Sequence, residues 1–315
     1  MMLVAGEALF DVFVGEPTAT GFVMEARLGG SPFNVAVGVA RLGQPVGFLG
    51  AVGAGRLGDR LVEALAAEGV DTAAVQRPAA PTTLGLVALD PRGVAEYAFY
   101  GEGAADRALA APPPALLAGV QALHVGSYAT VVGDTARTLA ECVATAPATC
   151  LVSYDPNVRL NVASSLEAWR ERLAWMLPRT QLLKISEEDL ALLEPGTSPE
   201  AFLAGCLAHG VRLAIVTRGG DGAVGACVAG SAVVPSCLAG PLVDTVGAGD
   251  TYQAALLVWL AERQLLSRDG VGSLGVDQLT EAMVFAARAA GITCSRRGAD
   301  LPRRDELPAA GVAVA

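Results

Sequence analysis

The chain has 315 residues, of which 52% are hydrophobic and 17% charged, and its formal net charge is −10. This length can bury a large core without requiring two domains. The acidic balance argues against a nucleic acid or an anionic membrane as the partner. We find no signal-peptide pattern at the N-terminus and no apolar run long enough to span a bilayer, which favours a soluble, cytoplasmic protein.

Apolar runs of strand length alternate with helical patterns along most of the chain. Such alternation predicts an α/β fold, with a mostly parallel sheet covered by helices on both faces. Ligands of such folds bind beyond the carboxyl ends of the strands. The predicted strands are Met2–Gly6, Val46–Val52, Ala122–Val125, Cys150–Tyr154, Leu182–Lys184 and Leu213–Thr217. The predicted helices are Asn34–Leu42, Gly58–Glu68, Thr135–Ala146, Glu167–Met176, Pro199–Ala208, a long helix from Asp250, and Leu279–Ala290.

Two stretches, at about 11–28 and 82–104, depart from this alternation. They carry short alternating or β-branched runs, with a turn at Asp90-Pro-Arg-Gly93. The pattern predicts a small antiparallel sheet inserted into the α/β body, and it leaves open whether that sheet is a lid over a cleft or a solvated hairpin. The whole chain, 1–315, is interpreted as one domain with this small β lid, and the segment from Pro308 as a frayed tail.

Small residues precede the long apolar helix of the C-terminal third. In Gly247-Ala248-Gly249-Asp250, the glycines allow a tight turn whose N–H groups point outward at the positive end of the helix, which makes an anion cradle. A carboxylate beside an anion suits a reaction in which a hydroxyl loses its proton while attacking a phosphorus. The alternative is a glycine-rich turn with an ordinary acidic residue in the first helical turn.

A second glycine cluster, Gly29-Gly30, comes shortly before Asn34 and opens another predicted helix. Two glycines permit close approach of a ligand to the backbone, and Asn34 offers both a donor and an acceptor to hydroxyl groups. Asp11, after the first strand, offers a carboxylate to a polyol. Each of these features is also common as a turn or a helix cap.

Polar groups follow three further predicted strands. In Asp155-Pro-Asn157-Val-Arg159, the Asp and Asn suit magnesium bound through water, and the Arg suits a phosphate group. The next strand end offers similar chemistry, or alternatively a helix N-cap, with the residues Lys184, Ser186, Glu188 and Asp189. The third forms a nucleotide-binding turn or a hairpin, with the residues Thr217, Gly219 and Gly222.

Other motifs narrow the chemistry. Gly53-Ala-Gly55-Arg-Leu-Gly58 fits a dinucleotide fingerprint, which keeps an NAD-dependent oxidoreductase as an alternative, although it does not open the first βα unit. No Walker A motif is present, so phosphate chemistry here does not use a P-loop. The six cysteines show no C-x-x-C spacing, which favours buried free thiols, and with two histidines a histidine metal site is nearly excluded. His124 is interpreted as a strand-end residue.

Together these segments resemble the PfkB (ribokinase-like) family of sugar kinases. The stretch Gly29–Gly43 is similar to the first signature of that family, and Asp244–Asp250 with its helix is similar to the second. The order of the intervening elements agrees over nearly the whole chain. The resemblance implies a ribokinase-like three-layer sandwich, with helices on both faces of the central sheet and a small β lid.

The resemblance also implies roles for single residues. Asp250 corresponds to the catalytic base, and Gly247, Ala248 and Gly249 correspond to the anion hole for the transferred phosphate. Asp11, Gly29, Gly30, Asn34, Phe99 and Arg159 are assigned to the sugar. Lys184, Ser186, Thr217, Gly219, Gly222 and Gly249 are assigned to the nucleotide. Asp155, Glu188 and Asp189 are assigned to Mg²⁺ bound mainly through water, and Asp244 to a monovalent cation such as K⁺.

The implied reaction is ATP-dependent phosphorylation of a primary hydroxyl. Segments at Gly6–Asp11, Asp155–Arg159 and Lys184–Leu190 are most similar to bacterial fructokinases, which favours D-fructose as the substrate. Ribokinase and 2-keto-3-deoxygluconate kinase are the alternatives. The acid sugar is disfavoured because Gly101, rather than an arginine, follows the aromatic pair at 99–100. The expected partners are the sugar and ATP, with no nucleic acid or membrane, and the resemblance implies a homodimer through the lid as one option.

Overall fold

The computed structural model describes residues 1–89 and 95–307 of the chain. The predicted turn at Asp90-Pro-Arg-Gly93 and the predicted tail from Pro308 lie outside these residues. Within them, the main sheet has nine strands in the order β13-β12-β11-β10-β9-β8-β1-β4-β5. The strands are β1 (Met2–Ala5), β4 (Val46–Ala51), β5 (Val75–Gln76), β8 (Ala122–Gly126), β9 (Leu151–Asp155), β10 (Leu182–Ser186), β11 (Leu213–Thr217), β12 (Ala223–Cys227) and β13 (Gly230–Val234).

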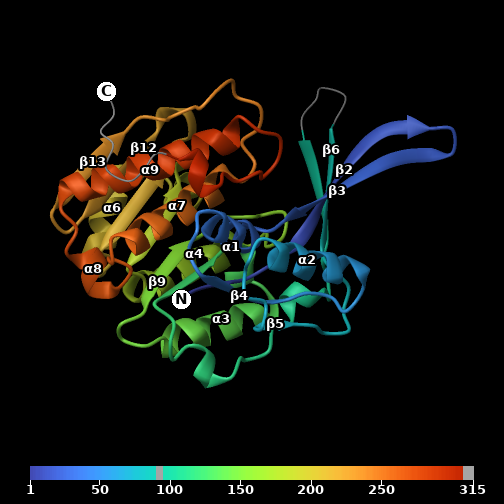
Figure 1. Cartoon of the computed structure of the whole chain (residues 1–315), viewed down its shortest axis with the longest axis horizontal. Helices are drawn as coiled ribbons and strands as arrows, with labels where there is room; N and C mark the ends of the chain where they lie inside the picture. The colour runs from blue at the N-terminus through green and yellow to red at the C-terminus, as the bar shows by residue number, and fades with distance from the viewer. Residues whose placement is uncertain (90–94, 308–315) are drawn as a thin grey trace.

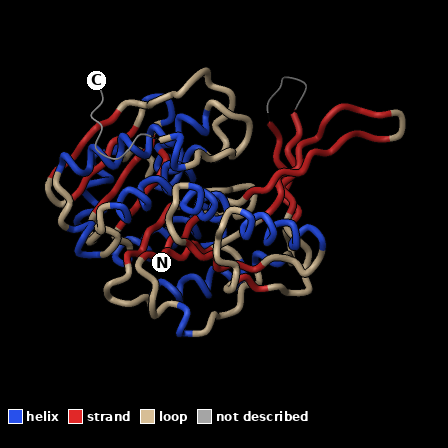
Figure 2. The backbone as a smooth tube through the Cα atoms, viewed as in Figure 1, coloured by secondary structure: helices blue, strands red, loops and turns tan. Residues whose placement is uncertain are grey.

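Neighbouring strands from β5 to β11 are parallel, as the strand–helix alternation predicts, and β12 and β13 run antiparallel at one edge. The helices are α1 (Ser31–Arg41), α2 (Arg56–Ala67), α3 (Gly133–Thr145), α4 (Leu166–Met176), α5 (Glu187–Leu193), α6 (Pro199–Ala208), α7 (Ala248–Glu262), α8 (Arg268–Gly272) and α9 (Val276–Cys294). Figure 2 shows the sheet running between helices. The predicted α/β layer architecture is confirmed.

Two apolar clusters, one on each face of the sheet, make the core. One joins α1, α2, α7, α8 and α9 to the sheet, and the other joins α3, α4, α5 and α6 to the opposite face. Helix α7 lies at the centre of the first cluster, and its residues from Asp250 to Leu260 are all buried. Because it has no solvent-facing side over these turns, its sequence is apolar all round rather than amphipathic.

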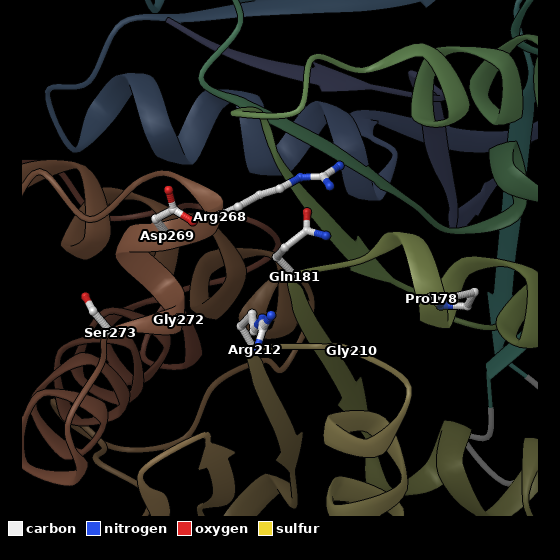
Figure 3. Close-up of a pocket in the computed structure, with 8 residues that line it drawn as sticks. All are labelled: Pro178, Gln181, Gly210, Arg212, Arg268, Asp269, Gly272 and Ser273. Atoms are coloured by element: carbon white, nitrogen blue, oxygen red, sulfur yellow. The ribbon is translucent and has the colours of Figure 1, made fainter.

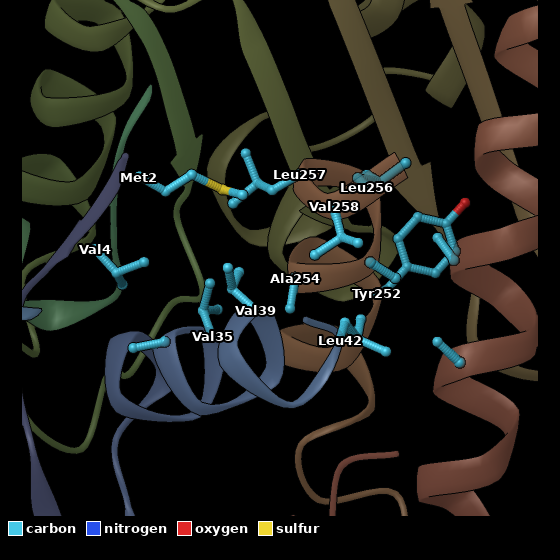
Figure 4. Packing of buried hydrophobic residues seen from close by; sticks show 14 of the residues in the cluster. Met2, Val4, Val35, Val39, Leu42, Tyr252, Ala254, Leu256, Leu257 and Val258 are labelled. Atoms are coloured by element: carbon cyan, nitrogen blue, oxygen red, sulfur yellow. The ribbon is translucent and has the colours of Figure 1, made fainter. Parts of the chain in front are cut away.

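Helices α1 and α7 pack closely against each other, and α1 also packs on β1. Figure 4 shows Val35 and Val39 of α1 facing Ala254 and Val258 of α7, with Met2 of β1 beside them. In an α-helix, residues four apart lie on one face. Ala254 and Val258 therefore lie on the same face of α7 as Asp250. Their apolar contacts with α1 fix the position of Asp250 relative to α1.

A second sheet of four strands projects from the body, in the order β3-β2-β6-β7 among the described residues. Its strands are β2 (Leu9–Thr18), β3 (Gly21–Gly29), β6 (Leu84–Leu89) and β7 (Ala95–Tyr100). Strand β2 pairs antiparallel with β3 but parallel with β6, so the sheet is mixed and the predicted purely antiparallel sheet is wrong. The parallel pair arises because the chain passes through α1, β4, α2 and β5 between β3 and β6, a long crossover rather than a hairpin. Figure 1 shows the hairpin of β2 and β3 reaching away from the helical layers. We call these four strands the lid sheet.

Candidate active site

The turn before α7 depends on Gly247. This residue is the N-cap, with φ 78° in the left-handed region, and a Cβ placed on it would lie 2.6 Å from the Cβ of Ala299. Only glycine fits both conditions. The Ala248 N–H donates to the carbonyl of Thr245 at 3.2 Å. The next two amides, of Gly249 and Asp250, lie in the first helical turn, where no preceding helical carbonyl accepts from them.

The carboxylate of Asp250 is buried and held by helix α1. The hydroxyl of Ser31 donates to Asp250 Oδ1 at 2.6 Å, and the amide Nδ2 of Asn34 donates to Oδ2 at 2.8 Å. Burial raises the pKa of Asp250, and these two hydrogen bonds act in the opposite direction. The two donors therefore fix the orientation of a carboxylate that is more basic than an exposed aspartate.

A buried ion pair lies under the first turn of α7. The ammonium of Lys184, on β10, is 2.8 Å from Asp155 Oδ2 at the end of β9. A Cβ placed on Gly249 would lie 3.2 Å from Lys184 Nζ, so the lack of a side chain lets the helix turn approach the cation. The cation and the exposed amides thus face the same place, where an anion would be stabilised from two sides.

Asp11 lies in a slot of the lid sheet. A Cβ on Gly29 would come within 2.4 Å of Asp11 Oδ2, and one on Gly85 would be 3.1 Å from Oδ1. The ring of Phe99 lies against Gly85 on the neighbouring strand. Burial raises the pKa of Asp11 to about 6, partly offset by the charge of Arg159, whereas the charge of Asp250 raises it further. Asp11 and Asp250 are therefore close enough to interact electrostatically.

The loop after β9 brings Arg159 between two acids. Its charge lowers the pKa of Asp11, and it does the same for Asp189. The pKa of Asp189 is raised to about 6, mainly by burial and secondly by the negative charge of Asp155. Its Oδ1 accepts the Val158 N–H at 3.2 Å. Arg159 is exposed, so its guanidinium remains accessible to a ligand.

The predicted N-cap alternative for the segment after β10 is present in the structure. Ser186 caps α5, and its hydroxyl oxygen accepts the Asp189 N–H at 3.0 Å. Glu188 in the same turn is exposed. A cap and a ligand-binding role are compatible for Asp189, because the cap uses its backbone and leaves its carboxylate to face Arg159.

The turn after β11 is also the hairpin into β12. Gly219 and Gly222 have φ of 53° and 84°, and a Cβ on Gly222 would lie 2.1 Å from the carbonyl oxygen of Val234. The backbone path therefore requires glycine at Gly222, whatever else the turn binds. Thr217 ends β11, and its hydroxyl donates to the carbonyl of Ile185 at 3.4 Å.

The Asp244 carboxylate ties two loops together. Its Oδ1 accepts the Val246 N–H at 3.0 Å, and its Oδ2 accepts the Gly298 N–H at 2.8 Å. The bond from Gly298 holds the segment before α7 against the loop that follows α9. A carboxylate with two amide donors keeps further lone pairs for another donor or a cation.

The described residues do not form a magnesium site built entirely from protein groups. In residues 1–89 and 95–307, no three His, Cys, Asp or Glu side chains gather closely enough to hold a metal ion. Mg²⁺ is usually held by one or two carboxylates together with phosphates and water. Asp155 fits this mode, because its Oδ1 has no hydrogen-bond partner among the described protein groups, and Asp189 is electrostatically coupled to it. Glu188 is not drawn into this pair.

Several site residues were not singled out from the sequence. Ser31 belongs to no polar motif in the sequence, although its position at the start of α1 is a usable signal. Glu7 is fully buried at the end of β1, bonds to Ser127, and has its pKa raised to about 8 by burial. Behind it, the Tyr128 hydroxyl donates to Asp106 Oδ2 at 2.9 Å. Glu7, Asp106 and Tyr128 are buried and close enough to interact electrostatically with one another.

The dinucleotide-like motif is closed by the protein itself. A Cβ on Gly58 would lie 1.8 Å from the carbonyl oxygen of Gly53, so this glycine serves the packing of α2 on its preceding loop. The same carbonyl accepts a hydrogen bond from Arg77 at 2.9 Å. Two glycines of this motif, Gly53 and Gly58, are therefore explained by the packing of the chain, whereas a Cβ on Gly55 would meet open space.

A cavity of about 550 Å³ lies at the opposite edge of the sheet, before β10 and β11 (Figure 3). It is lined by Pro178, Gln181, Gly210, Arg212, Arg268, Asp269, Gly272 and Ser273. None of the residues assigned to the sugar, the nucleotide or the metal lines this cavity. The candidate active site is the group of side chains at the carboxyl ends of the parallel strands, where the fold class places ligands.

The site combines a buried, oriented carboxylate, free amides at a helix start, a buried ammonium and polar groups of a projecting sheet. A hydroxyl placed at Asp250 can lose its proton while an anionic group is held by the amides and Lys184. This arrangement defines an α/β enzyme for phosphoryl transfer to a small polyhydroxyl substrate.

Comparison with known proteins gives the family. The model of the pfkB family of carbohydrate kinases matches residues 3–306, and the chain belongs to this family. A fructokinase of Rhizobium leguminosarum bv. trifolii is 33% identical over 305 residues, covering 96% of this chain and 91% of the relative. A fructokinase of Klebsiella pneumoniae is 32% identical, covering 96% of this chain and 97% of the relative.

Solved structures agree with the fold. The structure of a fructokinase from Xylella fastidiosa with bound ATP superposes with a TM-score of 0.84 at 27% identity, covering 98% of this chain and 94% of that one. A putative ribokinase II from E. coli in complex with ATP and Mg²⁺ gives a TM-score of 0.78 at 27% identity, covering 95% and 94%. The predicted family, ribokinase-like fold and carbohydrate kinase class are confirmed. The NAD-dependent alternative is not retained.

Proposed function

We propose that the protein is an ATP-dependent kinase that converts D-fructose to fructose 6-phosphate. The observation that carries the reaction is the Asp250 carboxylate held by Ser31 and Asn34 beside the amides of the α7 start. The fructokinases at 32–33% identity over almost the whole chain support fructose as the sugar. Ribose is the alternative among neutral sugars, supported by the fold of the putative ribokinase II.

In the proposed mechanism, Asp250 accepts the proton of the primary hydroxyl as its oxygen attacks the γ-phosphorus of ATP. The new O–P bond forms while the bond to the ADP oxygen breaks. The Gly249 and Asp250 amides, with Lys184 beneath them, stabilise the charge on the transferred group. The Ala248 amide contributes less than the sequence pattern predicts, because it already donates to Thr245.

We propose that Asp11 and the backbone around Gly30 bind the sugar hydroxyls. Asn34 connects this subsite to the base, since its amide already donates to Asp250. Phe99 would form one wall of the subsite. Arg159 would reach the substrate or a phosphate from the loop after β9. A 2-keto-3-deoxy acid sugar remains the weaker alternative, because its carboxylate would need a cation. Gly101, rather than an arginine, follows the aromatic residues of β7.

ATP and a divalent metal ion are required by the kinase reaction. We propose Mg²⁺ as the metal, bound by Asp155 and Asp189 through water and by the phosphates of ATP, where its charge would neutralise the phosphate oxygens. The nucleotide would lie along the turn of Thr217, Gly219 and Gly222. We further propose a K⁺ ion near Asp244, which an activity titration with KCl against NaCl would check.

We propose a homodimer formed through the lid sheet and a cytoplasmic location. Phe22, Val23 and Met24 on β3 are all at least half exposed, an unusual density of apolar groups on a projecting hairpin. All six cysteines belong to the described residues and carry free thiols, as expected in a reducing compartment. Four of them are buried as predicted, whereas Cys237 is exposed and Cys294 is half-buried. No helix among the described residues is long and apolar enough to cross a membrane.

A panel of sugars tests the proposal. D-fructose, D-ribose and 2-keto-3-deoxy-D-gluconate are offered with ATP and Mg²⁺, and ADP release is followed by a coupled assay. We expect the highest kcat/KM for fructose and a loss of roughly a hundredfold to ten-thousandfold in kcat for Asp250→Asn, because the proton acceptor is removed. A higher kcat/KM for another sugar would refute fructose, and an active Asp250→Asn variant would refute the base.

A further inference from the structure

A strip of polar residues crosses the side of the central sheet that faces α7. His124, which was expected to end a strand, lies in the middle of β8, and its register partner is Ser153 of β9. Two residues further along β9 comes Asp155, which pairs with Lys184. All four side chains are buried. Their neighbours on this face of the sheet, such as Leu151, belong to the apolar cluster around α7. A polar strip in this position requires a reason other than core packing.

A buried glutamine connects α7 to the strip. Gln253 Nε2 donates to Ser153 Oγ at 2.9 Å, and Ser153 Oγ lies 3.1 Å from His124 Nδ1. Since the Ser153 hydroxyl oxygen accepts from Gln253, its single proton can be donated to His124. Nδ1 is then the hydrogen-bond acceptor, and the imidazole is neutral. Burial lowers the pKa of His124 to about 3, so the ring stays neutral throughout the physiological range.

This chain of bonds satisfies only part of the polar groups that it buries. Within the described residues, Gln253 Oε1 and His124 Nε2 are buried and have no protein hydrogen-bond partner. Buried polar atoms left without a partner are costly, and a leucine at position 253 would match the apolar turns of α7 around it. The glutamine is therefore better explained by what its one bond positions.

The spacing along the helix matches the spacing along the strand. Gly249 and Gln253 are one turn apart on the same face of α7, a rise of about 6 Å. Ser153 and Asp155 are two residues apart on the same face of β9, a rise of about 6.6 Å. Gln253 meets Ser153 at one level, and Gly249 meets the Lys184 of the ion pair at the next. A slip at the first level would therefore move the second.

We propose that Gln253, Ser153 and His124 are positioning residues that fix the height of α7 against the sheet, and so hold the Gly249 amide and Asp250 at the strand ends. None of the three belongs to the groups assigned to the sugar, the nucleotide or the metal. Their effect on catalysis passes through the first turn of α7. The inference rests on the carbohydrate kinase activity of the family and does not depend on which sugar is used.

The test compares two buried glutamines. Gln253→Met removes the bond to Ser153 and preserves side-chain length. Gln181→Met is the matched control, because the buried Gln181 accepts the Val152 N–H at 2.9 Å and donates to the Arg179 carbonyl at 3.2 Å, at the opposite edge of the sheet (Figure 3). Both variants are assayed well below their Tm, on the sugar that the wild type phosphorylates best.

We expect kcat of Gln253→Met to fall roughly tenfold to a hundredfold, because a displacement near 1 Å at a reacting group has effects of that size. KM for sugar and for ATP should stay within about twofold, since the binding groups are intact. Gln181→Met should lose Tm but keep kcat. Equal kcat in the two glutamine variants would overturn the proposal.

Ser153 gives a second, independent test. Ser153→Ala should reduce kcat as Gln253→Met does, and Ser153→Thr, which keeps the hydroxyl, should restore most of it. The double variant Gln253→Met/Ser153→Ala should have the same kcat as either single variant, because both changes break the same bond. Its Tm should exceed that of Ser153→Ala, because fewer buried polar atoms are left unpaired. Additive losses of kcat, or a Ser153→Ala variant with wild-type kcat, would contradict the positioning role.

Discussion

At the scale of single residues, the site shows which polar groups a sequence reveals and which it hides. Asp250 and Asp11 stand out because each follows glycines or a strand end, where ligands are expected. Ser31 and Gln253 do not, because a serine at a helix start is common and one glutamine in an apolar helix has no motif. Their importance comes from a partner more than 90 residues away along the chain, which no local pattern encodes.

Burial gives Asp11 a pKa that can be tested by the pH dependence of sugar binding. Its pKa of about 6 means that the carboxylate is ionised at pH 7 and becomes protonated as the pH falls through 6. The protonated form accepts sugar hydroxyls poorly, so we expect KM for the sugar to rise below pH 6 and to be flat above pH 7. Initial rates between pH 5 and 8 measure this.

The Asp11→Asn variant separates Asp11 from other titrating groups. Losing a charged hydrogen-bond acceptor costs about 1.5–3 kcal/mol, so KM for the sugar should rise roughly tenfold to a hundredfold at pH 7. That raised KM should no longer change between pH 5 and 7. An unchanged KM at pH 7 would remove Asp11 from the sugar subsite, and a persisting acidic rise would assign the titration to another group.

At the scale of elements, periodicity was sufficient for most of the body. The predicted bounds of α6 and β11 agree with the structure, and those of the other predicted elements differ at one or both ends. The hairpin of β12 and β13 was not predicted as strands, because a mixed sheet edge breaks the strand–helix alternation on which the prediction relied. Which helices pack against each other could not be predicted from the sequence either, since nothing around Gly38 in α1 indicates that it faces Ala254 in α7.

Gly38 sets the distance between α1 and α7. A Cβ on it would lie 2.8 Å from Ala254 Cβ and 2.6 Å from Leu301 Cδ2. Gly38 is one turn from Asn34, and Ala254 is one turn from Asp250, so the two helices touch at adjacent levels. We expect overpacking of about 1–3 kcal/mol in Gly38→Ala to exceed the gain in helix propensity of about 1 kcal/mol. The variant should be less stable, with a lower kcat.

Gly205 in α6 provides the control for that substitution. Nothing lies within 4 Å of a Cβ placed there, so Gly205→Ala should raise the free energy of unfolding by up to about 1 kcal/mol and leave kcat unchanged. Urea unfolding of both variants gives the sign of each change. A Gly38→Ala variant that is stabilised like Gly205→Ala would show that α1 and α7 have room to spare.

At the scale of the whole molecule, the body and the lid sheet differ in how they bury their surfaces. The body has an apolar cluster on each face of its sheet, whereas the outer half of the β2–β3 hairpin is exposed. The sequence predicts this inserted sheet from its alternating runs, but alternation gives no information on what covers it. Strand β6 pairs with β2 over Phe10–Phe13, near the base of the hairpin, so the exposed outer half is a two-stranded ribbon among the described residues. Two strands alone are at best marginally stable in water, which favours a partner for this outer half.

The lid hairpin supplies a direct test of the proposed dimer. Phe22 and Met24 alternate onto the same face of β3 and are 55% and 50% exposed. We expect the wild type to sediment at twice the chain mass of 31.9 kDa, and the double variant Phe22→Glu/Met24→Glu at the chain mass, because charges would be buried in the interface. Val233→Glu, on the 66% exposed Val233 of edge strand β13, is the control and should remain dimeric.

A monomeric wild type at micromolar concentration, or a double variant that still dimerises, would rule out the lid as the interface. If the dimer forms through the lid, KM for the sugar should rise in the double variant, because Asp11 lies on the same strand pair.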